Sequence, residues 1–269
     1  MRRLTAALAV LVLAVSAGCG GDDAADTTAG GPAATGGEPA FTTLTDGEIL
    51  VGSDIPYEPF EFGNPPDYDG FDVELMRAIA DRLGVELVWR DAPFNPIFNN
   101  LRNNNYDAVI SASTITPERQ QIVAFSDPYF EANQSILVRA DTTDISSEAD
   151  LEGLTLGAQQ GTTGEAKAKE IPGATVRSYP GVNQAFNALL TEQVDAVVND
   201  LAVSADFASQ NDAVRIAGEI QTGEQYGIAV SKDNPELLAA INDALAELSE
   251  DGTYDDIYEK YFGQTPQGD

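Results

Sequence analysis

The stretch GFDVELMRAIADRL, residues 70–83, decides the fold of this chain when it is taken with the segments on either side. ILVGSD at 49–54 precedes it, and VELVW at 85–89 follows it. Within 71–83 the apolar residues recur at the spacing of a helix with one buried face, whereas both flanking runs are short and rich in valine, isoleucine or leucine. A strand, a helix and a second strand in this order predict a βαβ unit with parallel strands.

The same alternation recurs along the rest of the chain. DAVISAS at 107–113 and PERQQIVAF at 117–125 continue the first set, and a second set runs from TLGAQQ at 155–160 to DAVVND at 195–200. Two such sets in 269 residues predict an α/β protein with two Rossmann-like lobes, whose ligands bind beyond the carboxyl ends of the strands. The similarity of DAVISAS and DAVVND indicates equivalent strands in the two lobes.

The first 18 residues are typical of a lipoprotein signal peptide. Two arginines lead into a mostly apolar run over 4–15, and small residues then precede Cys19, the only cysteine in the chain. This run is shorter than the roughly 20 residues that span a bilayer. Cys19 is therefore the expected site of lipid attachment, although Ser16 stands where the lipobox pattern has an aliphatic residue.

Residues 19–43 predict a flexible tether between that anchor and the folded lobes. They are rich in glycine, alanine, threonine, aspartate and proline, and they show no apolar periodicity. Such a composition cannot bury enough apolar surface to offset the entropy lost on folding. The tether would let the lobes move near a membrane surface.

Charge and residue usage exclude several classes of function. The chain has 14 basic and 44 acidic residues, a formal net charge of -30, which argues against nucleic acid as a partner. It has no histidine, the commonest general base and metal ligand, so we expect no metal site. The acidic surface favours solubility first, and the capture of cationic solutes second.

Six motifs in order resemble the family 3 extracellular solute-binding proteins, the polar amino acid receptors of ABC importers. The motifs are VGSDIPYEPFEF (51–62), GFDVELMRAIADRL (70–83), SASTITPERQQIVAFSDPYF (111–130), LGAQQGTTGE (156–165), VDAVVND (194–200) and LSEDGTYDDIYEKYFG (248–263). Each motif alone is a weak signal, but six in the right order are a strong one. The resemblance covers nearly the whole chain after the tether.

This resemblance implies a type II periplasmic-binding-protein fold, in which a two-strand hinge joins the lobes. Lobe one would comprise residues 44–133 plus 226–264 and lobe two residues 134–225, with the chain crossing near 132–135 and 225–227. The expected protein is a monomeric, lipid-anchored subunit on the extracytoplasmic face of the cell membrane. It would capture a free amino acid, deliver it to the permease subunits of the importer, and need no cofactor.

A zwitterionic ligand needs a cation for its carboxylate, and Arg119 is the first candidate. Thr116 and Pro117 are a typical N-cap and first residue of a helix, which puts Arg119 in the first turn. Its guanidinium can hold a carboxylate through two hydrogen bonds, or it can serve a structural acidic partner. Across the cleft, Thr162 and Thr163 follow a strand and open a helix, where N–H groups and hydroxyls can meet an anion or can simply cap the helix. The family resemblance described above favours the ligand role.

The ligand's ammonium needs an anion, and Asp200 ends a strand at the edge where ligands bind. From the sequence alone, an aspartate at such a position is more often the N-cap of the next helix. The resemblance favours the ligand role, and it also implies ligand contacts from Ser111, Ala112 and Thr114 through backbone and hydroxyl groups. Many family members carry a glycine or serine where Ala112 stands.

The ligand's side chain would lie between Tyr57 and Phe94, which match family aromatics in turn-like segments. Stacking on these rings suits a flat or cationic group. Variable family positions that would set specificity are occupied here by Asp54, Gln159, Asn95 and Asn199.

A basic amino acid is the favoured ligand, and glutamine is the alternative. Arginine, lysine and ornithine suit Asp54 and the acidic surface, whereas the amide of Gln159 suits glutamine. Two other classes remain as alternatives: a periplasmic cyclohexadienyl or arogenate dehydratase on the same fold, and a sensor module. The expectation is a binding protein and not an enzyme.

Overall fold

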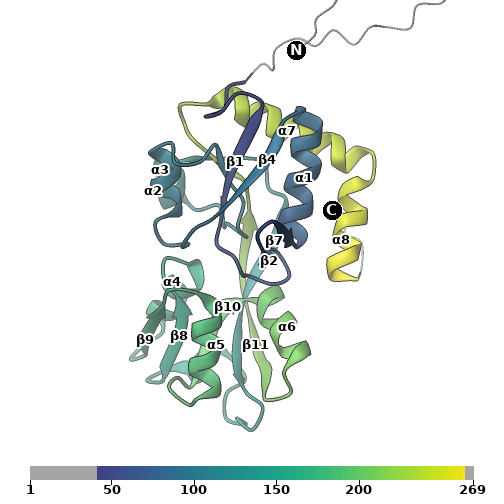
Figure 1. Ribbon diagram of the computed structural model, residues 1–269. Coiled ribbons are helices and arrows are strands. Elements are labelled where there is room, and N and C mark those ends of the chain that lie inside the picture. The colour runs from purple at the N-terminus through teal and green to yellow at the C-terminus, as the bar shows by residue number, and fades with distance from the viewer. Residues whose placement is uncertain (1–40, 264–269) are drawn as a thin grey trace, which may run out of the picture. The chain divides into compact units, whose positions relative to one another are not determined.

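Two five-stranded sheets organise residues 41–263, the part of the chain that this computed structural model describes (Figure 1). The first sheet has the order β4 (Glu86–Asp91), β1 (Glu48–Ser53), β5 (Ala108–Val109), β12 (Ala229–Val230), β6 (Ala124–Phe125). The second has the order β11 (Val214–Tyr226), β7 (Phe130–Arg139), β10 (Ala196–Asp200), β8 (Thr155–Gln159), β9 (Thr175–Tyr179). The expected pair of α/β lobes is confirmed. The predicted signal peptide, Cys19 and nearly all of the tether lie outside the described residues.

The two sheets repeat one pattern of strand directions. β1 is parallel to β4 and β5, and β8 is parallel to β9 and β10, as the βαβ alternation predicts. Each sheet also contains antiparallel strands, which the alternation did not predict: β12 beside β5 and β7 beside β10. These strands belong to the segments in which the chain crosses between the lobes, so no crossover helix constrains their direction. β5 and β10 hold the same place in the two patterns, which confirms that DAVISAS and DAVVND are equivalent.

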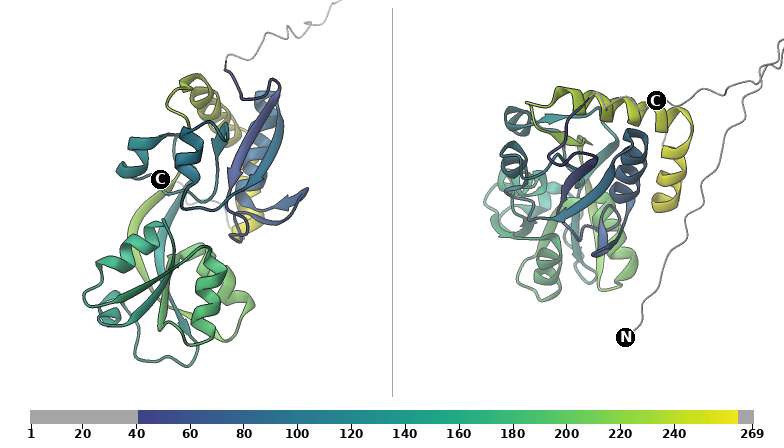
Figure 2. Two further views of the ribbon diagram at one scale, coloured as in Figure 1. Left: turned by 60° about the vertical axis from the view of Figure 1, so that its left-hand side comes forward. Right: turned by 45° about the horizontal axis from the view of Figure 1, so that its top comes forward.

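β7 and β11 run side by side from one half of the molecule to the other (Figures 1 and 2). They pair antiparallel from Arg139 and Val214 at one end to Phe130 and Tyr226 at the other. Both expected crossings, near 132–135 and 225–227, fall on this pair. The domain boundaries themselves stay a prediction.

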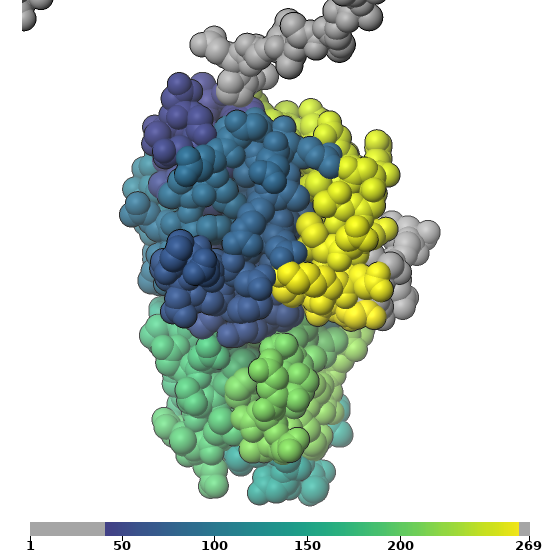
Figure 3. Space-filling model, turned by 45° about the vertical axis from the view of Figure 1, so that its right-hand side comes forward, coloured from purple at the N-terminus to yellow at the C-terminus, as the bar shows by residue number. Residues whose placement is uncertain are grey.

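Helices cover both sheets. In the first half they are α1 (Phe71–Leu83), α2 (Ile97–Arg102), α3 (Pro117–Ile122), α7 (Pro235–Glu250) and α8 (Thr253–Phe262). In the second half they are η1 (Glu148–Leu151), α4 (Thr163–Glu170), α5 (Val182–Leu190) and α6 (Leu201–Gln210). α1, α7 and α8 pack against one another, which brings the C-terminal helices onto the half built from the N-terminal strands (Figure 3). None of the helices between residues 41 and 263 has the length and apolar character needed to cross a bilayer.

An aromatic cluster fixes the crossing strands to the first half. The ring of Phe130, at the start of β7, lies 5.0 Å from Phe60, 5.4 Å from Tyr226 and 5.0 Å from Phe262 between ring centres. Phe60 and Tyr226 are fully buried, and each buried ring removes a large apolar surface from water. The ends of β7 and β11 are therefore tied to the segment after β1 and to α8.

Gly70 starts α1 with a backbone that only glycine adopts without strain. Its φ is 127°, and a Cβ at this position would overlap the backbone carbonyl of Phe60. Phe60 belongs to the segment that carries Tyr57 into the pocket, since the backbone N–H of Phe60 donates to the Tyr57 carbonyl at 3.0 Å. The close approach at Gly70 thus positions both α1 and this segment.

Gly70→Ala should destabilise the protein by about 3 kcal/mol, because it adds both backbone strain and a clash with the Phe60 carbonyl. Gly84→Ala is the matched control, since Gly84 has a φ of 69° but nothing within 4 Å of its would-be Cβ. It should cost about 1 kcal/mol through strain alone. Urea unfolding of both variants measures the difference, and equal losses would show that the approach to Phe60 is unimportant.

Candidate functional site

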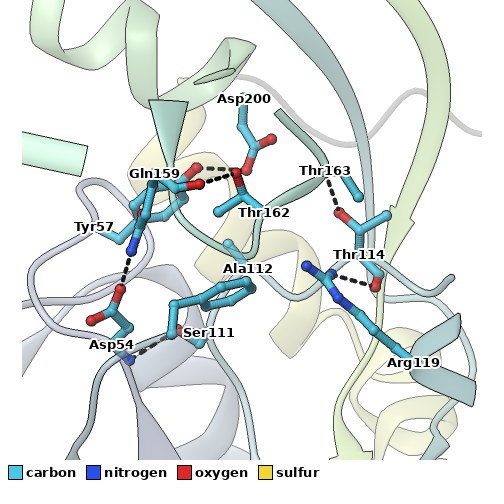
Figure 4. A pocket seen from close by; sticks show the side chains of 11 residues that line it. Asp54, Tyr57, Ser111, Ala112, Thr114, Arg119, Gln159, Thr162, Thr163 and Asp200 are labelled. Carbon is cyan, nitrogen blue, oxygen red and sulfur yellow. Dashed lines mark hydrogen bonds between the residues drawn. The ribbon is translucent and has the colours of Figure 1, made fainter. Parts of the chain in front are cut away.

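One pocket gathers all eleven side chains that the sequence singled out as ligand-binding (Figure 4). They are Asp54, Tyr57, Phe94, Ser111, Ala112, Thr114, Arg119, Gln159, Thr162, Thr163 and Asp200. Most of them follow the carboxyl ends of β1, β5, β8 and β10, the edge where the parallel strands were expected to present ligands. Side chains from both lobes fill most of this pocket in the structure, and the cavity that remains is about 10 Å³, room for about one water molecule.

Arg119 supplies the pocket's cation. Thr116 is the N-cap of α3 and Pro117 its first residue, as predicted, and this places the arginine in the first turn. The guanidinium donates to the carbonyls of Thr114 at 2.7 Å and Gly161 at 3.1 Å. These partners come from the two different lobes. Arg119 therefore reaches across the cleft.

The guanidinium of Arg119 is buried without an ion-pair partner among residues 41–263. Its carbon lies 5.1 Å from the ring centre of Phe94 and 4.9 Å from that of Phe98, distances that suit cation–π attraction. Burial lowers the pKa of Arg119 to about 10, so the side chain stays charged at neutral pH. The structural alternative required a partner carboxylate, and the partners found are carbonyls. A buried charge of this kind attracts an anion from outside.

The start of α4 faces Arg119 from the second lobe. Thr162 is the N-cap: its hydroxyl accepts from the N–H of Glu165 at 3.1 Å and donates to the carbonyl of Gln159 at 2.8 Å. The hydroxyl of Thr163 donates to Glu224 at 2.7 Å. Both hydroxyl protons are thus used within the protein. The N–H of Thr163, in the first turn of the helix, is the group at this end that can meet an anion.

Asp200 presents its carboxylate to the pocket. The residue is at the N-cap position of α6, but its side chain makes no capping hydrogen bond. Instead it accepts from Tyr57 Oη at 2.6 Å and from Gln134 Nε2 at 2.5 Å. Burial, together with the nearby charge of Glu224, raises the pKa of Asp200 to about 6. Of the two roles left open by the sequence, capping is therefore not the one observed.

Two buried acids below the pocket hold the end of β5 in place. Ser111 Oγ donates to Glu61 at 2.7 Å, and the N–H of Ala112 donates to Asp72 at 2.7 Å. Ala112 has a φ of 43°, an unusual value for a residue with a Cβ, and the bond to Asp72 helps to keep it there. Burial raises the pKa of Asp72 to about 7 and that of Glu61 well above its ordinary value.

Asp54 and Gln159 meet across the cleft at the other end of the pocket. The amide nitrogen of Gln159 donates to Asp54, and the N–H of Asp54 donates to Ser111 Oγ at 3.0 Å. Burial, with a smaller contribution from the charge of Asp91, raises the pKa of Asp54 to about 6. The pocket thus has a cation at one end and carboxyl groups at Asp54 and Asp200.

Two of the predicted specificity positions lie elsewhere. Asn199 is buried behind the pocket, where its Oδ1 is 3.1 Å from Tyr57 Oη, and Asn95 is exposed. Neither belongs to the lining of the pocket. Asn95 lies within the turn before α2 with its side chain close to Gly161 of the other lobe, and Phe94 is the residue of this turn that lines the pocket. Within residues 41–263 no group of histidine, cysteine or acidic side chains has the arrangement of a metal site.

Four polar residues that the sequence did not indicate support the site: Glu61, Asp72, Gln134 and Glu224. Asp72 had a recognisable signal, because it is an acid on the otherwise apolar face of α1. Gln134 and Glu224 had none, since they sit on the crossing strands β7 and β11 and meet only through strand pairing. The sequence places them 90 residues apart.

Comparison with known proteins shows what the chain is similar to. The model of the bacterial extracellular solute-binding proteins, family 3, matches residues 49–264. The ABC transporter arginine-binding protein 1 of Escherichia coli (strain K12) is 34% identical over 224 residues, which cover 81% of this chain and 91% of that protein.

Two solved structures share the fold. An ancestral arginine-binding protein bound to glutamine is 43% identical, with a TM-score of 0.79 over 82% of this chain and 100% of that one. An ancestral amino acid-binding protein, a precursor of cyclohexadienyl dehydratase, is 39% identical, with a TM-score of 0.75 over 80% of this chain and 95% of that one. The expected periplasmic-binding-protein fold is confirmed.

The buried carboxyls predict that the protein becomes more stable as the pH falls. The pKa values of Asp54, Asp72 and Asp200 are raised to about 6, 7 and 6, above those of an unfolded chain. The folded state therefore binds protons that the unfolded state does not, and this stability is lost as the pH rises through the folded pKa values. Each carboxyl should add about 1.4 kcal/mol for each pH unit below its folded pKa, down to about pH 4.

Urea unfolding at pH 8 and pH 5 tests this expectation in the wild type and two variants. Asp200→Asn should reduce the gain between the two pH values by about 1 kcal/mol, because it removes one titrating group. Asp81→Asn, at an exposed position on α1, should keep the full gain. A wild type that is less stable at pH 5 than at pH 8 would contradict the assignment.

Proposed function

We propose that this chain, which belongs to the bacterial extracellular solute-binding proteins of family 3, captures a free basic amino acid between its lobes for an ABC importer. One observation carries the proposal. A single pocket holds a buried guanidinium, that of Arg119, a buried carboxyl, that of Asp200, and a half-buried carboxyl, that of Asp54. A basic amino acid has one carboxylate and two positively charged groups, which are the complement of these three side chains.

The backbone groups of such a ligand match one end of the pocket. Its carboxylate would lie against Arg119 and the N–H of Thr163, and its ammonium would lie against Asp200 and the hydroxyl of Thr114. A guanidinium and a carboxylate form strong, charge-assisted hydrogen bonds, and so do an ammonium and a carboxylate. The Tyr57 hydroxyl, which now donates to Asp200, would become a neighbour of the ammonium.

The side chain of the ligand would end at Asp54. Among the lining residues Arg119 is positive and Asp54 and Asp200 are negative when ionised, and the carboxylate of Glu224 lies directly beside them. The site therefore has an excess of negative charge, which a ligand of net charge +1 reduces and a neutral ligand does not. Leaving a charge buried and uncompensated is costly. Tyr57 and Phe94, both buried, would line the path of the aliphatic part and could stack on a guanidinium.

Glutamine is the second candidate within the same class. Gln159 lines the pocket beside Asp54. The side-chain amide of glutamine can donate a hydrogen bond to Asp54 and accept one from Gln159. The ancestral arginine-binding protein whose structure contains glutamine shows that a related pocket admits both ligands. The charge balance of the pocket ranks the basic amino acids first.

A dehydratase is the candidate from another class. A solved relative is a precursor of cyclohexadienyl dehydratase, and Asp54 and Asp200 have pKa values of about 6, in the range that suits a general acid. We rank this function lower, because Arg119 and Asp200 suit the carboxylate and the ammonium of a bound amino acid. Incubation with prephenate or arogenate should release no product.

Delivery to a membrane partner completes the proposal. We propose lipid attachment at Cys19, a tether over residues 19–43, lobe one at 44–133 plus 226–264 and lobe two at 134–225, joined by β7 and β11 as a hinge. The protein would act as a monomer on the extracytoplasmic face of the cell membrane and hand its ligand to permease subunits. The mass of the mature N-terminus tests the anchor directly.

Calorimetric titration with the twenty amino acids and ornithine tests the ligand class, and Asp54→Asn tests the role of the side-chain pocket. The variant keeps the size and hydrogen-bonding capacity of the residue but removes its charge. Binding of arginine and lysine should weaken about 10- to 100-fold, the usual worth of a hydrogen bond to a charged group, while neutral ligands change little.

Asp91→Asn is the matched control. Asp91 is exposed, and its charge acts on Asp54 from outside the pocket lining. This variant removes the same charge but should change arginine affinity only about twofold, as a screened surface charge does. A wild type that prefers glutamine to arginine, or an Asp54→Asn variant with undiminished arginine binding, would refute the basic ligand and leave the amino acid class standing.

A further inference from the structure

Glu224 lies beside the pocket without belonging to its lining. It is on β11, and its Oε2 atom accepts hydrogen bonds from Thr114 Oγ1 at 2.8 Å and Thr163 Oγ1 at 2.7 Å. Thr114 and Thr163 both line the pocket, one from each lobe. The carboxylate of Glu224 therefore contacts both hydroxyls from outside the pocket lining.

The proton count of this group fixes the direction of each hydroxyl. A threonine hydroxyl has one proton and two lone pairs, whereas a carboxylate only accepts hydrogen bonds. Thr114 and Thr163 must therefore each donate their single hydroxyl proton to Glu224. The two hydroxyl oxygens lie 3.4 Å from each other, and neither has a proton left to bridge that distance. What each presents to the pocket is a lone pair.

Gln134 joins this group to Asp200. Its Nε2 atom donates to Asp200 Oδ1 at 2.5 Å and lies 3.3 Å from Thr163 Oγ1 and from both carboxylate oxygens of Glu224. Gln134 is fully buried on β7, so its amide is held in one position. The amide turns its protons towards the two carboxylates and keeps them apart. Tyr57 and Gln134 thus donate to Asp200, while the hydroxyls of Thr114 and Thr163 beside it have acceptor positions left for a ligand.

We infer that Glu224 is a positioning residue that turns the hydroxyls of Thr114 and Thr163 into acceptors, so that the pocket selects a ligand with an α-ammonium over one with an α-hydroxyl. An ammonium donates three protons and brings no lone pair, and it can satisfy Asp200 and both threonines. A hydroxyl donates one proton and turns its own lone pairs against the remaining acceptors. This inference rests on the proposed function, because it concerns the same ligand.

Glu224→Gln tests the inference with L-arginine and its α-hydroxy analogue, in which a hydroxyl replaces the amino group. The glutamine amide can donate to a threonine oxygen, which frees the hydroxyl proton to turn into the pocket. The wild type should bind arginine about 100-fold or more tightly than the analogue, and this ratio should fall about tenfold or more in the variant. Calorimetry measures both affinities, and thermal melting checks that the variant is folded.

Two controls separate the hydroxyl mechanism from a loss of charge or of structure. Glu219→Gln changes an exposed glutamate of the same strand and should leave the ratio unchanged. In a Thr114→Val, Thr163→Val background, Glu224→Gln should alter the ratio no more than about twofold, since the groups through which it acts are gone. A purely structural residue would weaken both ligands equally, in either background.

The outcomes distinguish the two levels of the account. A wild type that binds no amino acid would refute the proposed function. A wild type that binds arginine but discriminates poorly against the α-hydroxy analogue, or whose ratio survives Glu224→Gln, would remove the role of Glu224 alone. A ratio of arginine to analogue affinity that still falls tenfold on Glu224→Gln when Thr114 and Thr163 are both valine would also refute the role of Glu224.

Discussion

The buried guanidinium of Arg119 is the constraint on which the rest of the site depends. It is held by one carbonyl from each lobe and by the rings of Phe94 and Phe98, with no ion-pair partner among the described residues. A charge removed from water in this way is costly until an anion joins it. The α-carboxylate of an amino acid can supply that anion, and Arg119 bridges to Gly161 only when the lobes are near each other. Ligand recognition and lobe closure therefore share one group.

The carboxyls of the pocket complement this cation. Asp200 accepts a hydrogen bond from Tyr57 of the other lobe, and Asp54 accepts one from Gln159 of the other lobe. These two cross-cleft hydrogen bonds involve the carboxyl groups that would meet the ligand's two cations. The main cause of both raised pKa values is burial, to which the charge of Asp91 adds at Asp54 and that of Glu224 at Asp200. A cationic ligand would offset that cost and lower both pKa values again. The hydroxyls of Thr114 and Thr163, with their protons turned towards Glu224, add acceptor positions beside Asp200.

The sequence predicted the lining of this pocket well and its support poorly. Helix-cap and strand-end patterns placed Arg119, Thr162 and Asp200 at the edge where ligands bind, but their ligand roles, like those of Tyr57 and Phe94, came from the family motifs. Gln134 and Glu224 could not be found, because they meet through the register of β7 and β11, which no local pattern determines. The antiparallel strands were missed for a similar reason, since the direction of a crossing strand depends on where the chain comes from. Asp72, an acid on an apolar helix face, was the one supporting residue with a readable signal.

A crystal structure of the protein grown with L-arginine would show where and in which direction the ligand binds. We expect an arginine in the pocket, with its carboxylate on the Arg119 guanidinium, its α-ammonium within hydrogen-bond distance of Asp200, and its own guanidinium at Asp54. An arginine bound in the reverse direction, or at a site that does not touch Arg119, would contradict this expectation.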